Sequence, residues 1–327
     1  MSQEKTTIAF MGDVMIGRRV NRQIKEKGFI YPWGNILAIL QQNAANIINL
    51  ETTLTTSQNK ISKVFNFKSD PQNVEVLEAA KITAVNLANN HVLDFGEEGL
   101  IETIKVLNTR KILHTGAGIN ITMATEPAIF LCGTLKFAML GFTDNERNWK
   151  AQSATSGINF MNINSTGDKN AAFRSLTKLK AEDNLFTIVS LHWGANFIEH
   201  PSTLFISLAH ELIDHGADMI YGHSAHIFQA IEVYNGKLIL YDTGDFIDDY
   251  QVDPVLRNDL SFLYSLTFKQ NKMEELNLIP VRISDCQVNI ATGHDRQWCM
   301  KRIQELSVRF FTRIKDGKID LSEPNSI

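Results

Sequence analysis

Six apolar segments of this 327-residue chain lead directly into residue types that bind metals or transfer protons. The most specific of them precedes Gly222-His223-Ser224-Ala225-His226, because two imidazoles in one tight turn after an apolar run seldom serve packing. The other five runs lead into Asp13, Glu51, Asn89-Asn90-His91, His192-Trp193-Gly194 and Asp242-Thr243-Gly244-Asp245. Imidazole, carboxylate and amide oxygen together suit zinc, manganese or iron, and the lack of cysteine among them argues against a site for a softer metal.

This mixture of ligand types favours hydrolysis at phosphorus. Two divalent cations roughly 3.5–4 Å apart can lower the pKa of a shared water and hold both oxygens of an in-line displacement. A carboxylate can bridge such a pair, and neutral imidazoles complete each coordination sphere without cancelling the positive charge that the transition state requires. A histidine that binds no metal could protonate the departing alkoxide. The residues therefore predict a metal-dependent hydrolase.

Each of these residues taken alone has an ordinary explanation. A single histidine is more often structural or exposed than a ligand. Asp13 alone could be a turn or helix-cap residue, and Asn89-Asn90 could be a turn. The prediction of a shared site therefore depends on all six segments together. Five further histidines are given no role in it: His114, His200, His210, His215 and His294.

Short apolar runs of strand length alternate with helical patterns along most of the chain. The expected strands are Ile8–Met11, Ile47–Leu50, Ile82–Leu87, Ala128–Cys132, Phe137–Phe142, Phe186–Leu191, Met219–Tyr221 and Leu238–Tyr241. The expected helices are Asn35–Ala44, Gln72–Ala80, Gly99–Thr109, Lys169–Ala181 and Pro201–His215. This alternation predicts an α/β domain with parallel strands, in which the ligand crevice lies outside the carboxyl ends of the strands. Residues distant in sequence are therefore expected to meet at one edge.

The chain after about residue 255 has a different pattern. Phe262–Phe268 and Leu276–Val288 are expected as consecutive strands, and Arg296–Thr312 as a closing helix. Because no linker rich in Pro, Gly and Ser interrupts the chain, we expect one domain over residues 1–327, with this C-terminal part belonging to it.

The composition is that of an ordinary globular protein, with 44% hydrophobic and 21% charged residues and a net charge of −4. Acidic and basic residues are interspersed, which argues against nucleic acid and polybasic membrane contacts, although bound cations could still attract an anionic substrate. Cys132, Cys286 and Cys299 are far apart and predict free thiols rather than a disulfide framework. The polar N-terminal residues 1–5 do not begin a secretory signal, and no stretch approaches the roughly 18 apolar residues of a membrane helix. A cytoplasmic protein without a membrane anchor is expected.

Six segments resemble the CapA family, which is named for poly-γ-glutamate capsule synthesis and belongs to the calcineurin-like metallophosphoesterase superfamily. The matching segments are GDVMIGR (Gly12–Arg18), NLETTLT (Asn49–Thr55), NLANNHVLDFGEEGL (Asn86–Leu100), LHWG (Leu191–Gly194), GHSAH (Gly222–His226) and YDTGDFIDDY (Tyr241–Tyr250). Their order and spacing resemble those of the family over roughly residues 6–290. The combination is specific, whereas any one segment alone would be weak.

The resemblance implies a four-layer αββα sandwich of two mixed sheets, with one or two divalent metal ions (Mn, Zn or Fe) between the sheet ends. It implies that a metal-bridging hydroxide is the nucleophile and His91 the general acid, with Asp94, Arg18 and Trp193 supporting or lining the pocket. The ligands that it implies are Asp13 and His226 for the first metal, Glu51 as the bridge, and Asn90, His192 and His223 for the second.

Three departures from the wider superfamily bear on this centre. Asp13-Val14-Met15 stands in place of an Asp-x-His pattern, so the first metal would lack the imidazole of that pattern and a one-metal resting state would fit. The bridging acid Glu51 lies in Asn-Leu-Glu rather than in a Gly-Asp context. Asp245 stands where many CapA-like chains have Asn; it could replace the missing ligand or repel an anionic substrate, and both alternatives stay open.

The leading hypothesis is a metallophosphoesterase that acts on a small-molecule or polymer phosphoester. A second hypothesis keeps the metal and changes the bond, so that a γ-glutamyl polymer is cut or transferred at an amide. A third is a non-catalytic accessory protein of capsule biosynthesis that binds polymer or partner proteins. A nucleotide-binding glycine loop and a Ser/His/Asp arrangement are both absent from the sequence.

Overall fold

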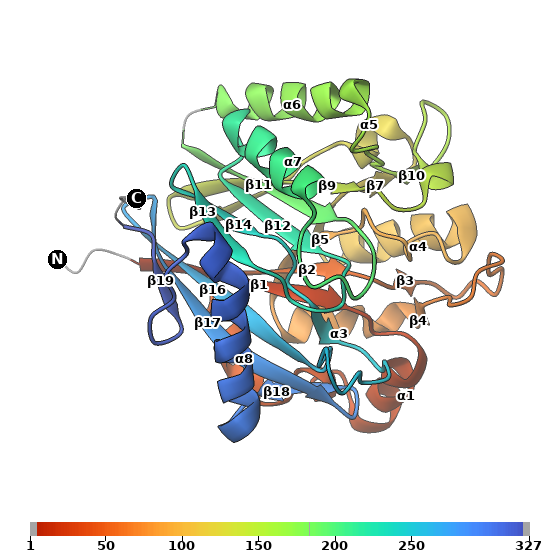
Figure 1. Ribbon diagram of the computed structural model, residues 1–327. Coiled ribbons are helices and arrows are strands. Elements are labelled where there is room, and N and C mark those ends of the chain that lie inside the picture. Colours follow the sequence, from red (N-terminus) through yellow and green to blue (C-terminus); the bar gives the residue numbers. More distant parts are fainter. Residues whose placement is uncertain (1–4, 183, 323–327) are drawn as a thin grey trace.

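Two mixed β-sheets pack face to face and helices cover their outer sides, so that the molecule has four layers (Figure 1). The computed structural model describes residues 5–182 and 184–322. Residues 1–4, which belong to the polar N-terminal segment, lie outside the described part. The α/β sandwich of two mixed sheets that the resemblance implied is confirmed.

The larger sheet combines a parallel half with an antiparallel half. Its strands are β1 (Lys5–Val14), β2 (Ala45–Leu50), β5 (Ile82–Asn86), β6 (Leu113–Thr115), β15 (Asp245–Ile247), β16 (Leu260–Lys269), β17 (Lys272–Ser284), β18 (Gln287–Ile290) and β19 (Lys318–Asp320). Their order is β18-β17-β16-β1-β2-β5-β6, with β15 beside β1 and β19 beside β17. β1 is central: it pairs in parallel with β2 and β15 and antiparallel with β16.

The smaller sheet has six strands in the order β13-β14-β12-β11-β9-β8. Their bounds are β8 (Ala128–Cys132), β9 (Leu135–Thr143), β11 (Leu185–His192), β12 (Met219–His223), β13 (Ile231–Tyr234) and β14 (Lys237–Leu240). The central strands β9, β11, β12 and β14 run parallel. The carboxyl ends of these strands and of β1 and β2 therefore form a common edge on which side chains from both sheets can meet.

Two apolar clusters bind the layers together. Along β1, Ile8 and Phe10 join the cluster between the two sheets, whereas Ala9 and Met11 join the cluster under the outer helices. This alternation follows from the two-residue period of a strand with both faces buried. Between the sheets, Phe137 meets Phe268 edge to face, with ring centroids 5.4 Å apart. Burial of each such side chain contributes about 1.5–3 kcal/mol.

Helices cover both outer faces and one open side of the sandwich (Figure 1). The longer ones are α1 (Arg18–Lys27), α3 (Val74–Ala79), α4 (Gly96–Thr109), α6 (Thr166–Lys180), α7 (Thr203–Asp214) and α8 (Gly293–Ser307). The short ones are η1 (Tyr31–Ile36), α2 (Leu37–Leu40), η2 (Pro71–Asn73), α5 (Ile121–Ala124), η3 (Arg147–Trp149) and η4 (Val308–Phe310). In α8, Cys299, Ile303 and Leu306 join the cluster between the sheets, so this helix seals its side.

The sequence patterns located most of these elements, and three predictions were wrong in their extent. The helix expected over Asn35–Ala44 is η1 followed by the single turn α2, because Ala44 already donates its N–H to Thr7 and enters the sheet. The strand expected over Leu276–Val288 is broken by a turn at Asp285 and Cys286, which have φ values of 51° and 63°. The helix expected over Arg296–Thr312 becomes η4 after Ser307 and ends at Phe311, in the left-handed region.

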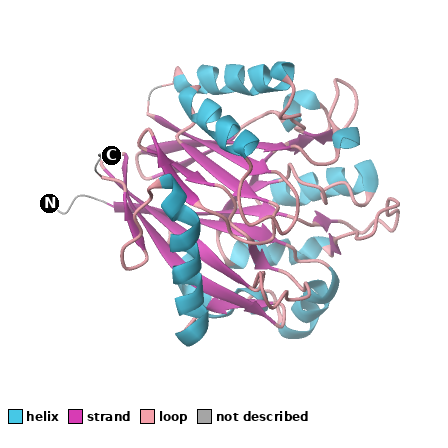
Figure 2. Ribbon diagram, viewed as in Figure 1, coloured by secondary structure: helices cyan, strands magenta, loops and turns pink. Residues whose placement is uncertain are grey.

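The connections at the carboxyl edge are long and irregular (Figure 2). They contain two small ladders, formed by β3 (Thr53–Leu54) with β4 (Lys68–Ser69) and by β7 (Ala117–Gly118) with β10 (Gly157–Ile158). These ladders hold the loops after β2, β4 and β6 at the carboxyl edge of the sheets. They thereby position the side chains that follow the strands.

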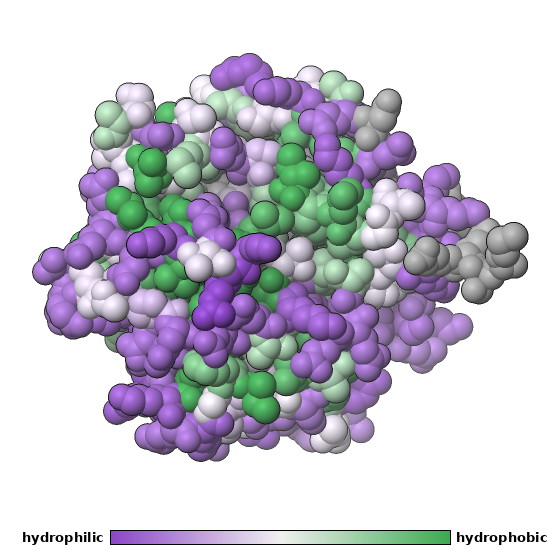
Figure 3. All heavy atoms as spheres, turned by 180° about the vertical axis from the view of Figure 1, so that it is seen from behind, coloured by the Kyte–Doolittle hydropathy of each residue, from purple (hydrophilic) through white to green (hydrophobic). Residues whose placement is uncertain are grey.

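Within the described residues, no helix is long and apolar enough to cross a membrane. The face seen in Figure 3 is largely hydrophilic, and its apolar side chains are interspersed with polar ones. The three cysteines are buried and free.

Candidate metal centre

The strand register of the larger sheet fixes three polar side chains side by side. Asp13 near the end of β1 has Asn49 of β2 and Asp245 of β15 as its register partners. The Asp13 N–H donates to the Gly244 carbonyl at 2.9 Å, and the Asn49 amide donates to Asp13 Oδ1 at 2.7 Å. Register partners on adjacent strands project from the same face, so the carboxylates of Asp13 and Asp245 lie next to each other on one face of the sheet.

The smaller sheet presents two imidazoles in the same way. His192 of β11 and His223 of β12 are register partners at the carboxyl ends of their strands. Their Nδ1 atoms are 3.0 Å apart, and His223 Nε2 lies 2.9 Å from the Ser190 hydroxyl. Both histidines are buried, so their pairing belongs to the interior of the centre.

The turn after β12 carries the third imidazole. Ser224 and His226 have φ values of 115° and 61°, a conformation that non-glycine residues adopt only when their surroundings hold them. Asp242 provides this support, because its Oδ2 accepts the Ala225 N–H at 2.8 Å. His226 is thereby placed with Nδ1 2.8 Å from Asp245 Oδ1.

The loops after β2 and β5 add Glu51, Asn90 and His91. The Asn89 side chain organises them: its amide donates to the Leu50 carbonyl and its oxygen accepts the His91 N–H. Asn90 Oδ1 then lies 3.1 Å from His192 Nε2. Glu51 Oε1 lies 4.0 Å from the same His192 nitrogen and 3.8 Å from His91 Nε2.

These donors fall into two groups in which every ligand atom lies within 4.8 Å of the others. We call Asp13, His192 and His223 the histidine cluster, and Asp13, Glu51, His226 and Asp245 the carboxylate cluster. Asp13 belongs to both, because its Oδ1 is 3.8 Å from His223 Nδ1 and its Oδ2 is 3.7 Å from His226 Nδ1. All six residues expected as metal ligands thus gather at this edge, and Asp245 joins them.

The centre contains buried carboxylates whose oxygens are only partly satisfied by neighbouring groups of the protein. Asp13 Oδ2, Glu51 Oε1 and Asp245 Oδ2 are buried and have no hydrogen-bond partner among the described residues. Burial accordingly raises the pKa of Glu51 to about 8 and raises those of Asp13 and Asp245 well above their usual range. Unpaired buried carboxylates are costly, and a divalent cation among them would remove that cost. The donor set therefore fits a divalent metal.

The two histidines of the histidine cluster suit metal binding because they are neutral. Burial lowers the pKa of His223 to about 3, and burial together with the neighbouring His223 lowers that of His192 well below its usual range. A neutral imidazole keeps a lone pair for a metal at physiological pH.

His91 lies beside the clusters and is held by a partner of its own. Its Nδ1 is 2.6 Å from Asp94 Oδ2, and its ring stacks on Phe67 with centroids 3.8 Å apart. Asp94 is fixed in turn by the Phe67 N–H at 2.7 Å and by Lys63 at 3.2 Å. Because Nδ1 donates to Asp94, Nε2 on the side of Glu51 is left as an acceptor, and burial, which lowers the pKa of His91 to about 4, keeps the ring neutral.

Arg18 lies on the rim rather than inside the centre. Its side chain is 39% exposed, and Nε is 3.4 Å from Asp249. Its guanidinium lies over Phe65 and Phe67, 5.6 and 5.7 Å from the ring centroids. Because Phe67 also stacks on His91, the Phe67 ring lies between the Arg18 guanidinium on the rim and His91 in the interior. Trp193, expected to support or line the pocket, is buried and donates its indole N–H to the carbonyl of Tyr241, directly after β14.

Sequence reasoning did not single out several residues that shape the centre. Asn49, Lys63 and Tyr250 act through contacts that no sequence spacing encodes; Tyr250, for example, lies 3.3 Å from Glu51 Oε2. Met15, which stands where an imidazole was missing, directs its sulfur at the Gly17 N–H and is not part of either cluster.

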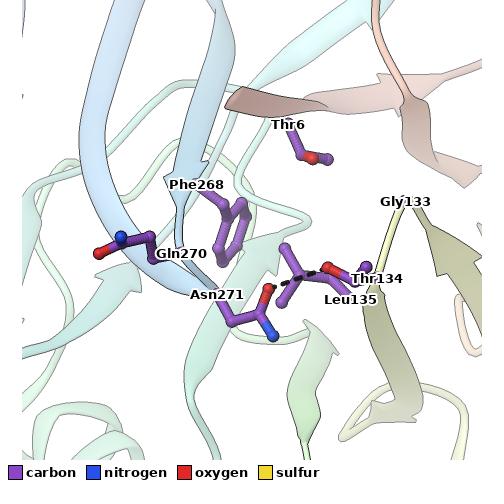
Figure 4. A pocket seen from close by; sticks show the side chains of 7 residues that line it. All are labelled: Thr6, Gly133, Thr134, Leu135, Phe268, Gln270 and Asn271. Atoms are coloured by element: carbon purple, nitrogen blue, oxygen red, sulfur yellow. Dashed lines mark hydrogen bonds between the residues drawn. The ribbon is translucent and has the colours of Figure 1, made fainter. Parts of the chain in front are cut away.

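A separate hollow at the amino end of the sheets has no comparable chemistry (Figure 4). Its lining residues carry no titratable side chain, and Thr134 and Asn271 hydrogen-bond across it at 3.3 Å. Those residues are Thr6, Gly133, Thr134, Leu135, Phe268, Gln270 and Asn271. The hollow is therefore not the reactive site.

Comparison with solved structures gives only weak similarity. The sulfate thiohydrolase SoxB of Thermus thermophilus aligns with a TM-score of 0.48 and 11% identity, over 92% of this chain and 60% of that one. The 5'-nucleotidase of Candida albicans aligns with a TM-score of 0.42 and 9% identity, over 81% and 47%. At these values neither similarity bears on the function.

Comparison with sequences is much more specific. A probable polyglutamine synthesis accessory protein of Mycobacterium tuberculosis is 33% identical over 320 residues, which cover 93% of this chain and 83% of that protein. The PGA biosynthesis protein CapA of Bacillus subtilis is 26% identical over 323 residues, covering 97% and 82%. Residues 7–250 match the family described as "Bacterial capsule synthesis protein PGA_cap". The resemblance expected from the sequence is confirmed, and the chain belongs to this family of bacterial capsule synthesis proteins.

Proposed function

We propose that this chain is a metal-dependent hydrolase of phosphoesters. One observation carries the proposal: Asp13, Glu51 and Asp245 belong with His226 to one group of donors, and each of these buried carboxylates has an oxygen without a hydrogen-bond partner among the described residues. Residues expected from sequence and separated by more than 200 positions supply this group. Such an arrangement is costly without a cation and stabilising with one.

The two clusters would hold one cation each. His192, His223 and Asn90 would hold one, and Glu51 and His226 the other, with Asp13 reaching both clusters. When bound, divalent cations would supply a nucleophile from water at neutral pH and would offset charge on a phosphoryl group. The cluster residues would hold these ions close to each other.

His91 is the residue that we propose to move a proton. Asp94 accepts a hydrogen bond from His91 Nδ1. Nε2 is therefore unoccupied and faces Glu51 and the centre. In its neutral form this nitrogen accepts a proton, and after accepting one it can donate it to the leaving alkoxide. Proximity of an anionic substrate would raise the pKa of this imidazole and favour the second role.

Arg18 and Lys63 would attract and position the anionic substrate. Lys63 lies beside Asn90 and His91, where it contacts the Asn90 carbonyl and Asp94. Arg18 is exposed on the rim and its guanidinium can offer paired N–H donors to a phosphate. The side chains of Arg18 and Lys63 bring positive charge to the substrate side of an otherwise acidic centre.

The test is a panel of phosphomonoesters and phosphodiesters presented to protein that has been stripped with chelator and reloaded with Mn, Zn or Fe. We expect turnover that depends on metal and falls at least ~100-fold in His192→Ala, since loss of residues that only support a ligand already costs 10–100-fold. His294→Ala is the matched control, because His294 is exposed on α8 and belongs to neither cluster. Bound metal with no turnover of any phosphoester would count against the proposal.

A second candidate is action on a γ-glutamyl polymer, or binding of one as an accessory protein. The names of the relatives from M. tuberculosis and B. subtilis favour it, because both refer to polyglutamine or PGA synthesis. Release of glutamate from poly-γ-glutamate by metal-loaded protein, without phosphoester turnover, would support the catalytic form. Unchanged capsule formation in cells that carry Asp13→Ala or His192→Ala would support the accessory form.

A further inference from the structure

Asp245 occupies a place in the centre that its backbone determines. β15 begins at this residue and pairs in parallel with the end of β1, where Asp13 is its register partner. Gly12 permits the close approach, because a Cβ on it would lie 1.8 Å from the Gly244 carbonyl oxygen. Asp245 is therefore held beside Asp13 by two strands rather than by a flexible side chain.

The two oxygens of Asp245 have different environments. Oδ1 lies 2.8 Å from His226 Nδ1, whereas Oδ2 is buried and has no partner among the described residues. Asp13 and Glu51, which belong to the same group of four donor residues, also have one unpartnered oxygen each. Three independent side chains of this group thus each have a buried oxygen without a partner among the described residues.

The composition of the two clusters differs sharply. The carboxylate cluster has three carboxylates and one imidazole, whereas the histidine cluster has two imidazoles and one carboxylate, with the Asn90 amide oxygen beside it. Oxygen ligands suit manganese and magnesium, and imidazole suits zinc and iron. The two positions are therefore chemically unequal.

We propose that Asp245 is a metal ligand in the carboxylate cluster and makes this position selective for a hard divalent cation such as Mn²⁺ or Mg²⁺, while the histidine cluster binds zinc or iron. The inference rests on the metal centre of the proposed function and assigns to Asp245 a direct contact with the ion. The resulting protein would hold two different metals in neighbouring positions.

The competing role for Asp245 is to orient His226 without touching a metal. Carboxylates often support a metal-binding histidine in this way. The variant Asp245→Asn separates the two roles, because its amide oxygen can still accept from His226 Nδ1 while the ligand charge is lost. An orienting role would survive the substitution, whereas a ligand role would lose the negative charge that favours a hard cation, so that the metal would bind more weakly.

The experiment measures binding of Mn²⁺ and Zn²⁺ to chelator-treated full-length protein without substrate, by equilibrium dialysis and by the electron paramagnetic resonance signal of Mn²⁺. With one equivalent of Zn²⁺ present, Asp245→Asn should weaken Mn²⁺ binding at least ~10-fold and leave Zn²⁺ binding unchanged. Asp248→Asn is the matched control, since Asp248 is a buried neighbouring carboxylate outside both clusters. It should leave Mn²⁺ binding close to that of the wild type.

The reciprocal variant His223→Ala should lose Zn²⁺ and keep Mn²⁺, which tests the division of metals even if Asp245→Asn fails to fold. Mn²⁺ binding by Asp245→Asn equal to that of the wild type, or loss of both metals in His223→Ala, would overturn the inference. Because no substrate is used, failure to hydrolyse phosphoesters would count against the proposed function and leave these binding results standing.

Discussion

Asp13 and Asp245 are register partners across the parallel pair of β1 and β15, although 232 positions separate them in the sequence. The backbone of each strand contributes to the contact, since the Asp13 N–H donates to the Gly244 carbonyl at 2.9 Å. Both carboxylates are buried, and each leaves one oxygen without a partner among the described residues. Strand pairing thus brings together two like charges that would repel without a cation between them.

Gly12→Ala should separate these two carboxylates. The added methyl group would lie 1.8 Å from the Gly244 carbonyl oxygen, which belongs to backbone and cannot rotate away. We expect a loss of about 1–3 kcal/mol in the free energy of unfolding, measured by denaturant titration, as for other overpacked sites. Metal binding should weaken as well, because β15 must shift away from β1.

Gly167→Ala is the control for this substitution. Gly167 lies in the first turn of α6, and the nearest atom to an added Cβ is the Ser165 hydroxyl at 3.7 Å. Alanine should leave stability unchanged or slightly higher there, because it favours helix more than glycine does. Equal stability and equal metal binding in Gly12→Ala and the wild type would show that the strands can part without effect on the centre.

The principal ligands could be predicted from sequence because they follow buried strands directly. Asp13, His192 and His223 lie at the carboxyl ends of β1, β11 and β12, and parallel strands bring these ends to one edge. Polar residues directly after apolar runs were therefore sufficient to identify them. The alternation of strands and helices predicted an α/β domain with parallel strands, whereas the sandwich of two sheets was implied only by the family resemblance.

Asp245 could be noticed in the sequence, but its position could not be predicted. β15 is only three residues long and follows Gly244, which has a φ of 69°, so no periodic pattern reveals it. The pairing of β15 with β1 is a long-range contact that depends on the turn at Gly244 and on the close approach that Gly12 permits. Lys63 is a similar case, because an irregular loop between β3 and β4 carries it to Asp94.

Arg18→Ala should weaken substrate binding more than turnover. The guanidinium is exposed on the rim and is held by Asp249, Phe65 and Phe67, so it can meet an anion without contacting either metal cluster. Loss of a charge-assisted hydrogen bond of 1.5–3 kcal/mol corresponds to an increase in KM of roughly 10–100-fold. Steady-state kinetics on the best phosphoester of the panel would measure the change in KM and kcat separately.

Arg19→Ala is the matched control for the arginine on the rim. The side chain of Arg19 pairs with Asp285 at 3.0 Å and does not contact the aromatic rings beside His91. Its removal should leave KM unchanged. If Arg18→Ala and Arg19→Ala had the same effect on KM, the effect would come from the surface charge in general and not from a contact between Arg18 and the substrate.

Asp94→Asn should reduce kcat while metal content stays at the wild-type level. Asp94 Oδ2 accepts from the Phe67 N–H and from His91 Nδ1, and Oδ1 accepts from Lys63; an amide has one acceptor oxygen, so its NH2 group must face either Lys63 or the Phe67 and His91 donors. The imidazole would then turn or adopt the other tautomer, so that Nε2 no longer accepts a proton. A comparable change in a hydrolase triad costs about 10⁴-fold, and we expect at least ~100-fold here.

Two measurements distinguish this positioning role from a structural one. The pH dependence of kcat should change in Asp94→Asn, because the protonation of His91 is no longer set by the carboxylate. Metal analysis of the purified variant should give the same stoichiometry as the wild type. A variant with normal kcat and an unchanged pH profile would exclude His91 and Asp94 as a proton-transfer pair.

Metal-free protein should lose stability as the pH rises from 6.5 to 8. Burial raises the pKa of Glu51 from 4.5 to about 8 and that of Asp242 from 3.8 to about 7. A raised pKa in the folded state means that the favourable contribution is complete below the unfolded value and is lost as the pH passes through the folded value. His223, with its pKa lowered to about 3, is neutral in the folded state and half protonated at pH 6.5 in the unfolded state, so it opposes the trend only at the lower end of this window.

Thermal unfolding in chelator and in excess Mn²⁺ would test this pH dependence. Tm should fall across the window in chelator, and the fall should be smaller with metal, because a cation stabilises the ionised carboxylates that burial disfavours. Glu51→Gln should flatten the slope in chelator, since it removes the carboxyl group that titrates near pH 8. A metal-free Tm that stays constant or rises between pH 6.5 and 8 would mean that these carboxylates already have a compensating positive charge within the protein.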